Sequence, residues 1–188
     1  MLNASILPHN ISLCGSKNRS RMLEVLVSQF RAAFVGIEYE VDMQTRIVNA
    51  QAFHIGGLRF VRLYGGLAFH PLVSEDALVF TLLHETGHHR ARGRRFAGDP
   101  ELACDCRADK WAVDAGARAL RRCTGRSMNL PAALDSLDEA VASINAGATA
   151  PRRRLRSLDC WAGFWPTRKS RLRIGNAPVP TGPCYHSR

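Results

Sequence analysis

The feature that most constrains the fold is the stretch from Ala77 to Arg90, which reads ALVFTLLHETGHHR. Two of its three histidines, His84 and His88, are four residues apart, and Glu85 directly follows the first. On an α-helix, residues four apart lie on one face, so His84 and His88 can bind the same metal ion. Glu85 would then lie beside a metal-bound water as a general base. The spacing therefore predicts a helix that carries half of a metal site.

The residues before the histidines favour this helix. Ser74 can cap its N-terminus, although Ala77 stands where a full capping box would have Glu or Gln. Glu75 and Asp76 suit the positive end of the helix dipole. An apolar stripe follows, formed by Leu78, Val79, Leu82 and Leu83. The alternative is an ordinary helix that ends in two partly exposed histidines.

A third ligand is needed, because a catalytic zinc ion usually has three protein ligands and one open position. Residues 99–112, DPELACDCRADKWA, supply candidates. Asp99 followed by Pro100 is typical of a helix start, with a capping side chain and then proline at the first helical position. We therefore expect a helix from Pro100 to about Cys123. Its acidic residues are spaced by four and would share one face: Glu101, Asp105 and Asp109.

Three parts of residues 49–112 resemble the gluzincin metallopeptidases, especially the CAAX-prenyl-endopeptidase and heat-shock-protease type and the ImmA-type regulatory peptidases. The first is HETGH at 84–88, with glycine before the second histidine. The second is NAQAFHIGGLRFVRLYGGL at 49–67, which is similar to the strand–turn–strand before their active-site helix. The third is DCRADKWA at 105–112, which is similar to the ExxADxxA of the helix that carries their third ligand.

This resemblance implies roles for the acidic residues. It places Asp105 at the position of the glutamate ligand, and Asp109 at an aspartate that orients a ligating histidine, as carboxylates often do in zinc sites. The chain departs from the family in having Asp at position 105. Because aspartate is one methylene shorter than glutamate, its helix has to lie closer to the metal. Glu101, longer and one turn earlier, is the alternative third ligand.

The rest of the chain predicts an α+β fold, a minimal zincin-like domain with an N-terminal helix and a small mixed sheet. We expect an N-terminal extension at residues 1–18, the metallopeptidase domain at 19–146 and a tail at 147–188. The expected elements are helices at 19–35 and 131–144, and strands at 46–50, 52–54, 58–63 and 67–70.

The family resemblance also bears on substrate binding. In such peptidases an edge strand pairs with an extended substrate, a role that falls here to the strand at 52–54 or at 58–63. Three residues are candidates to assist an oxyanion, although a lone histidine in a strand is more often structural: His54, His70 and Tyr64.

The composition changes at residue 147. Residues 151–188 carry eight Arg and one Lys against one Asp, which is +8 of the chain's +10. Trp161, Phe164 and Trp165 lie between two arginine-rich runs. This pattern favours a flexible or loosely docked tail. The alternative is an arm that binds nucleic acid or another polyanion, with arginines on phosphates and aromatic rings available for stacking.

Two further patterns bear on the compartment. No apolar run approaches the roughly 18 residues of a membrane span, and Pro8 and Asn10 interrupt the N-terminal apolar stretch, which does not resemble a signal peptide. We therefore expect a cytoplasmic protein. The six cysteines lack CxxC spacing, so free thiols are expected, with a Cys160–Cys184 disulfide only in an oxidising compartment.

Together these patterns predict a zinc-dependent metallopeptidase acting on a protein or peptide substrate. Zn²⁺ held by His84, His88 and Asp105 would activate a water, and Glu85 would take its proton and pass it to the departing amine. One alternative is a non-catalytic zinc-containing binding or regulatory protein that acts on nucleic acid or a polyanion through the tail. Another is a DNA-associated regulator whose peptidase cuts a repressor, as ImmA-type proteins do.

Overall fold

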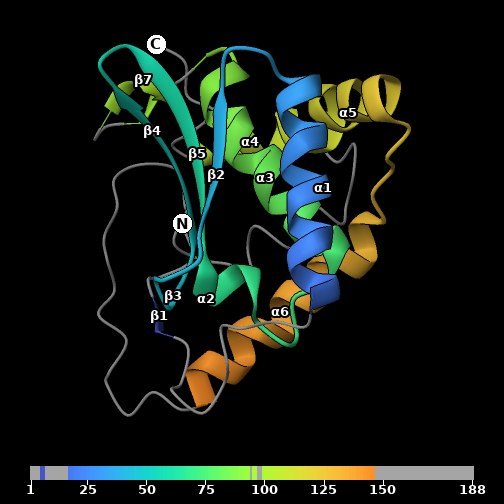
Figure 1. Ribbon diagram of the computed structural model, residues 1–188. Coiled ribbons are helices and arrows are strands. Elements are labelled where there is room, and N and C mark those ends of the chain that lie inside the picture. Colours follow the sequence, from blue (N-terminus) through green and yellow to red (C-terminus); the bar gives the residue numbers. More distant parts are fainter. Residues whose placement is uncertain (1–4, 7–16, 94, 97–98, 147–188) are drawn as a thin grey trace.

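Helices and a small mixed sheet make up the fold, so the α+β class is confirmed (Figure 1). The computed structural model describes residues 5–6, 17–93, 95–96 and 99–146. Most of the proposed N-terminal extension and the whole tail at 147–188 lie outside these residues. Within the part of the chain that the structure describes, every helix is too short or too polar to cross a lipid bilayer.

The helices agree closely with the sequence pattern at both ends of the domain. The elements are α1 (Lys17–Ala33), α2 (Gly65–Ala68), α3 (Glu75–Arg90), α4 (Asp105–Trp111), the π-helical segment η1 (Ala112–Gly116), α5 (Ala117–Thr124) and α6 (Leu130–Ala146). Helix α6 is capped by Asn129, whose Oδ1 accepts the N–H of Ala132 at 3.2 Å. Gly125, with φ of 73°, ends α5 close to the predicted position.

The central sheet has the strand order β2-β5-β4, with β2 (Glu38–Asp42) parallel to β5 (Leu58–Tyr64) and β4 (Ala50–Ile55) antiparallel to it. Gly56 and Gly57 form the tight β4–β5 turn, and both have positive φ, which glycine adopts at little cost. Two short pairs complete the strands: β1 (Ser5–Ile6) with β3 (Ile47–Val48), and β6 (Arg95–Phe96) with β7 (Asp99–Ala103).

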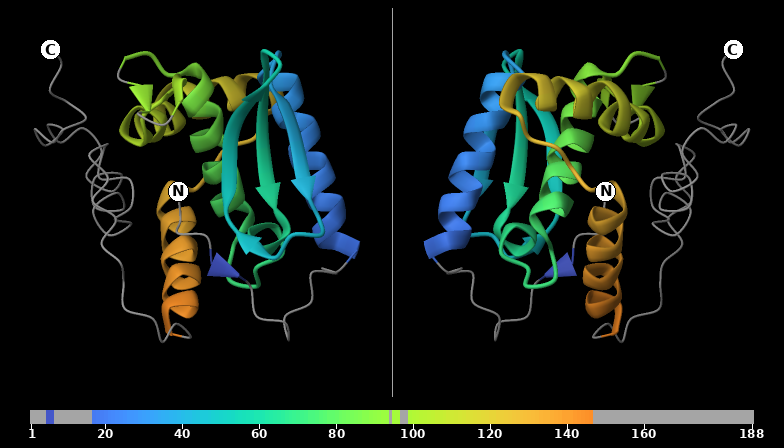
Figure 2. Two further views of the ribbon diagram at one scale, coloured as in Figure 1. Left: turned by 90° about the vertical axis from the view of Figure 1, so that its left-hand side faces the viewer. Right: turned by 90° about the vertical axis from the view of Figure 1, so that its right-hand side faces the viewer.

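Helix α3 lies at the centre of the molecule. The sheet contacts one side of it, while α4, η1 and α6 contact its other sides (Figures 1 and 2). The sheet faces the helices with its small and apolar alternate residues: Tyr39, Ala50, Ala52, Val61 and Leu63. Every α3 residue from Ala77 to His89 is therefore buried, including the polar ones. The predicted apolar stripe underestimates how completely this helix is enclosed.

Two predictions about the sheet are wrong. Strand β2 was not expected, and the strand expected at 67–70 is replaced by helix α2 and a turn. The glycine pair before that segment explains the change. A Cβ on Gly66 would come within 2.1 Å of the Arg46 carbonyl oxygen, and one on Gly65 within 2.9 Å of the Asp42 carbonyl oxygen. Only glycine allows the chain to start a helix this close to the neighbouring backbone.

The helix start expected at Asp99–Pro100 is also wrong, because residues 99–103 form strand β7. Asp99 Oδ1 accepts the N–H of Glu101 at 2.9 Å, so its side chain supports a local turn instead of a helix N-terminus. Helix α4 begins later, at Asp105, after Cys104 in an extended conformation. The acidic residue at 101 consequently does not share a helix face with those at 105 and 109.

Candidate metal centre

His84, Glu85 and His88 lie on the last two turns of α3. The predicted cap fixes the start of this helix, because Ser74 Oγ accepts the N–H of Ala77 at 3.2 Å. With regular helical geometry, the two imidazoles face each other, and their Nε2 atoms are 3.1 Å apart. Both histidines are buried, with 4% and 7% of the residue surface exposed.

The other nitrogen of each imidazole has an acceptor as its partner. His88 Nδ1 lies 2.6 Å from the carbonyl oxygen of Ala103, and His84 Nδ1 lies 2.8 Å from Asp109 Oδ1. A carbonyl or carboxylate oxygen can only accept, so each Nδ1 carries a proton, and in the neutral ring Nε2 then keeps its lone pair. Two lone pairs therefore converge across 3.1 Å. Such an arrangement is repulsive without a cation, and a metal ion fits it well.

Asp105 supplies a third ligand atom. Its Oδ1 lies 3.5 Å from His84 Nε2 and 3.8 Å from His88 Nε2. The three ligand atoms lie within 4.8 Å of one another, so these buried residues could hold a metal ion. A tetrahedral zinc ion with bonds near 2.0–2.1 Å separates its ligand atoms by about 3.3 Å. The observed spacings match that geometry to within a small side-chain movement.

Glu101, the alternative third ligand, lies elsewhere. It is on β7 with 69% of its side chain exposed, and its carboxylate faces the ring of His54 at 3.4 Å. The structure thus brings Asp105 to the histidines and leaves Glu101 outside the group. Asp109, one turn after Asp105, contacts His84 on the side away from the site, as the resemblance implies for that position.

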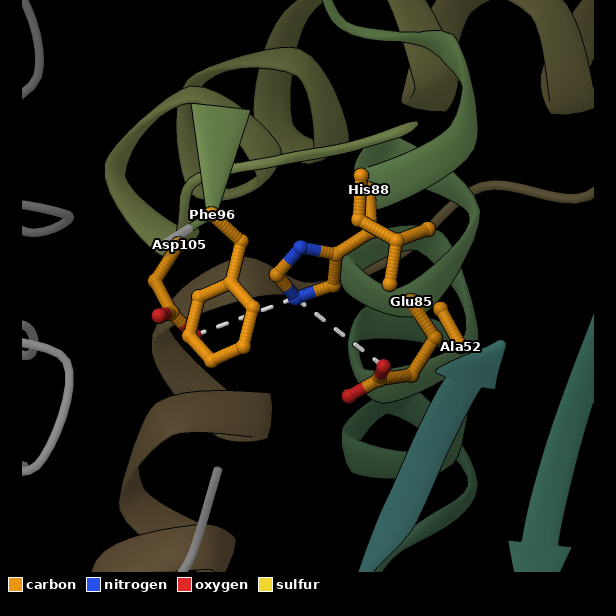
Figure 3. A pocket seen from close by; sticks show the side chains of 6 residues that line it. Ala52, Glu85, His88, Phe96 and Asp105 are labelled. Atoms are coloured by element: carbon orange, nitrogen blue, oxygen red, sulfur yellow. Dashed lines mark ion pairs between the residues drawn. The ribbon is translucent and has the colours of Figure 1, made fainter. Parts of the chain in front are cut away.

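Glu85 borders the same pocket. Its two carboxylate oxygens each lie 4.0 Å from a ligand nitrogen, one from His84 Nε2 and the other from His88 Nε2. Figure 3 shows the carboxylates of Glu85 and Asp105 on opposite sides of the His88 ring. The Glu85 carboxylate is therefore placed to exchange a proton with a water between the three ligands.

The rest of the pocket is apolar. The whole pocket has a volume of about 290 Å³, including space open to solvent. Besides Glu85, His88 and Asp105, the residues that line it are Ala52, Phe96 and Leu102 (Figure 3). The last two come from the β6–β7 hairpin, as does the Ala103 carbonyl that holds His88. The helix predicted from Pro100 onward concealed the contributions of Leu102 and Ala103, and Phe96 was not among the predicted site residues. The proline at 100 was the available signal, because a residue before proline favours extended backbone.

Burial also favours the neutral forms of His88 and His89. Desolvation lowers the pKa of His88, and the neighbouring His84 lowers it further. The neutral form that results is the one that binds metals. His89, the next residue, is a structural histidine: its Nε2 lies 2.9 Å from the Phe60 carbonyl oxygen, and burial lowers its pKa to about 4.

The sheet topology distinguishes the two strands that were proposed to pair with a substrate, at 52–54 and 58–63. Strand β5 pairs on both sides and cannot accept another strand, so the prediction for residues 58–63 is wrong. Strand β4 lies at the sheet edge, and its Ala52 lines the pocket.

The oxyanion candidates lie outside the pocket lining. His54 Nδ1 faces the Asp99 and Glu101 carboxylates, His70 Nδ1 accepts the N–H of Leu72, and Tyr64 donates to Gln51.

Comparison with protein-family models, curated proteins and solved structures finds no match to this chain. The candidate centre is therefore defined by its own geometry. Two imidazole nitrogens and one carboxylate oxygen form a donor set that suits zinc and other divalent transition-metal ions.

Proposed function

We propose that the chain is a zinc-dependent metallopeptidase with Glu85 as its general base. The observation that carries this proposal is the convergence of ligand atoms from His84, His88 and Asp105, with the Glu85 carboxylate beside them. Structural zinc sites are usually closed by four protein ligands, whereas catalytic sites have three and an open position. Among the described residues, the group has three members, which favours a catalytic site.

The roles of the protein groups follow from their positions. When bound, zinc supplies a Lewis acid that lowers the pKa of water and polarises a carbonyl group. Glu85 accepts a proton from the attacking water and then donates it to the departing amine. Asp109 and the Ala103 carbonyl hold both imidazoles with Nε2 toward the site. The edge of β4 pairs with the main chain of an extended peptide.

Metal analysis combined with a casein-cleavage assay tests this proposal. We expect Glu85→Gln to retain zinc and lose turnover by about a hundredfold or more, because it cannot move the proton. His88→Ala should lose both zinc and turnover. His89→Gln is the matched control, since this neighbouring buried histidine points to the sheet, and it should retain zinc. Wild-type cleavage by the Glu85→Gln protein would contradict the assignment of the base.

The alternative of a non-catalytic binding protein stays a prediction, because the basic tail at 147–188 lies outside the described residues. The same experiment separates the two functions. A binding protein would retain zinc and show no cleavage that depends on Glu85.

A further inference from the structure

One face of the central sheet has no described helix over it. The left view of Figure 2 shows β2, β5 and β4 in front of α3, with this face toward the viewer. We call it the outer face. It carries the even-numbered residues of β2 and β5 and the odd-numbered residues of β4, because side chains alternate along a strand and Tyr39, Val61 and Ala52 are buried on the other face. Among the described residues, the outer face is therefore open to solvent or to a partner.

The centre of the outer face is an apolar patch, formed by Phe53, Ile55, Leu58 and Phe60. Phe53 and Phe60 pair across the two strands, and their rings are stacked with 5.3 Å between centroids. Ile55 and Leu58 form the next pair on this face and are 59% and 61% exposed. Adjoining exposed apolar side chains, unlike single ones, indicate an interaction surface.

Acidic side chains on β2 border this patch. Glu38, Glu40 and Asp42 occupy the outer face of that strand. Arg62 is the basic residue on the same face, and its Nε lies 2.5 Å from Glu40 Oε1. A hydrogen bond from the Thr45 hydroxyl lowers the pKa of Asp42, which therefore stays ionised. With three carboxylates and one guanidinium, the outer face has a net charge of −2, so it favours a cationic partner and repels a polyanion such as nucleic acid.

The tail at 147–188 has the complementary chemistry. Its residues 151–188 carry eight Arg and one Lys against one Asp, and Trp161, Phe164 and Trp165 lie between two arginine-rich runs. The chain is also long enough to reach the outer face. Helix α6 ends at the same end of the molecule as β5 (Figures 1 and 2). The 14 residues from 147 to 160 span up to about 46 Å when extended, which is about twice the length of the 7-residue strand β5.

We propose that the tail binds the outer face of its own chain. Trp161, Phe164 and Trp165 cover the apolar patch, and arginines on either side of them pair with the carboxylates of β2. Burial of the aromatic side chains supplies the main attraction, because exposed ion pairs contribute little. The acidic border adds specificity for this cationic segment. The inference does not depend on the candidate metal centre, whose pocket is lined by Ala52 on the other face of the sheet.

Photo-cross-linking of the full chain tests this contact. The photoreactive amino acid p-benzoylphenylalanine replaces Trp165, and mass spectrometry locates the cross-links after irradiation. We expect cross-links within one chain to residues 51–62. Ile55→Asp combined with Leu58→Asp should lower their yield by about tenfold or more, because two apolar contacts are lost. Glu38→Lys should also lower the yield, because it reverses one charge of the acidic border.

Two exposed residues of α1 provide matched controls. Val25→Asp and Glu24→Lys make the same chemical changes away from the sheet, and both should give the wild-type yield. A wild-type yield in the protein with Ile55→Asp and Leu58→Asp would overturn the proposal, as would cross-links located on a helix instead of the sheet.

Two other occupants are distinguished by the same experiment. Cross-links between chains that increase with protein concentration would make the outer face a contact between two copies. A tail that cross-links to added duplex DNA in preference to residues 51–62 would be a polyanion-binding arm. Either result would overturn binding of the tail to its own chain.

Discussion

At the scale of single residues, the centre depends on what holds each imidazole from behind. Asp109 fixes the tautomer of His84, and a backbone carbonyl does the same for His88. In the neutral rings, the two nitrogens that face the site then present lone pairs. The contact from Asp109 can be removed by mutation, whereas the Ala103 carbonyl belongs to the backbone and cannot.

Asp109→Ala should weaken zinc binding by about 10- to 100-fold without removing any of the three proposed ligands. Asp109→Asn should have a smaller effect, because an amide oxygen can still accept the His84 Nδ1–H. Chelator competition measures both. Asp114→Ala, which removes an exposed partner of Arg118 on the same run of helix, is the control. Wild-type affinity in Asp109→Ala would show that the contact does not support the centre.

His70 gives a second prediction, on pH. Burial lowers its pKa, the charge of Arg19 lowers it further, and the neutral Nδ1 accepts the N–H of Leu72. As pH falls below about 6.5, His70 is protonated in the unfolded chain before it is protonated in the folded protein. The stability that its neutral form contributes above that pH is therefore lost as the pH falls through the folded-state pKa.

His70→Asn keeps an acceptor and removes this titration. Urea unfolding of the metal-free proteins at pH 7.5 and 5.5 should show a smaller loss of stability in this variant than in the wild type. Equal losses in the two proteins would exclude His70 as a source of the pH dependence.

At the scale of elements, the two ends of α3 have different roles. Its N-terminus is held by Ser74, which caps the helix and also donates its own N–H to Ser136 Oγ on α6. Its C-terminal turns carry the candidate centre. Helix α4, the β6–β7 hairpin and the edge strand β4 approach those turns from outside, and together with α3 they line one pocket.

Ser74→Ala should lower the free energy of unfolding by about 1 kcal/mol, because the Ala77 N–H loses its acceptor. Ser74→Asp should retain most of the stability, since aspartate is also a good cap. Urea denaturation measures both variants. Zinc affinity should stay at the wild-type value in each, as the cap lies at the other end of α3. An unchanged midpoint for Ser74→Ala would show that the cap contributes little.

At the scale of the whole molecule, the candidate centre joins parts of the domain that are far apart in sequence. Helix α3 contacts the sheet on one side and α4 on the other, while Tyr39 on β2 reaches it through a 2.7 Å hydrogen bond to Thr86. A metal bound between α3 and α4 should therefore stabilise the folded domain as a unit.

Zinc removal should lower the thermal midpoint of the wild-type protein. Free zinc at about 100 times its dissociation constant would stabilise the folded state by about 2.7 kcal/mol through mass action. Calorimetric scans with zinc and with a chelator measure the difference. His88→Ala should unfold at one temperature in both conditions. A wild-type midpoint that does not respond to the chelator would contradict a metal bound by the folded state.

The sequence by itself determined the local features of this protein. The spacing of His84 and His88, the Ser74 cap and the amphipathic patterns act within a few residues, so α1, α3 and α6 were predicted with nearly the right ends. The likeness to a family motif supplied Asp105 and Asp109. The α+β class followed from the change in periodicity between the helices.

Tertiary structure decided everything that depends on pairing between distant segments. Residues 99–103 are extended because they pair with β6, and this pairing removed Glu101 from the site while bringing the Ala103 carbonyl to His88. Strand β5 is central because β2 pairs beside it in parallel. The close approach of α3 and α4 at Ala108 depends on Gly87 having no side chain. Such contacts are set by packing across the whole domain, which no local pattern in the sequence encodes.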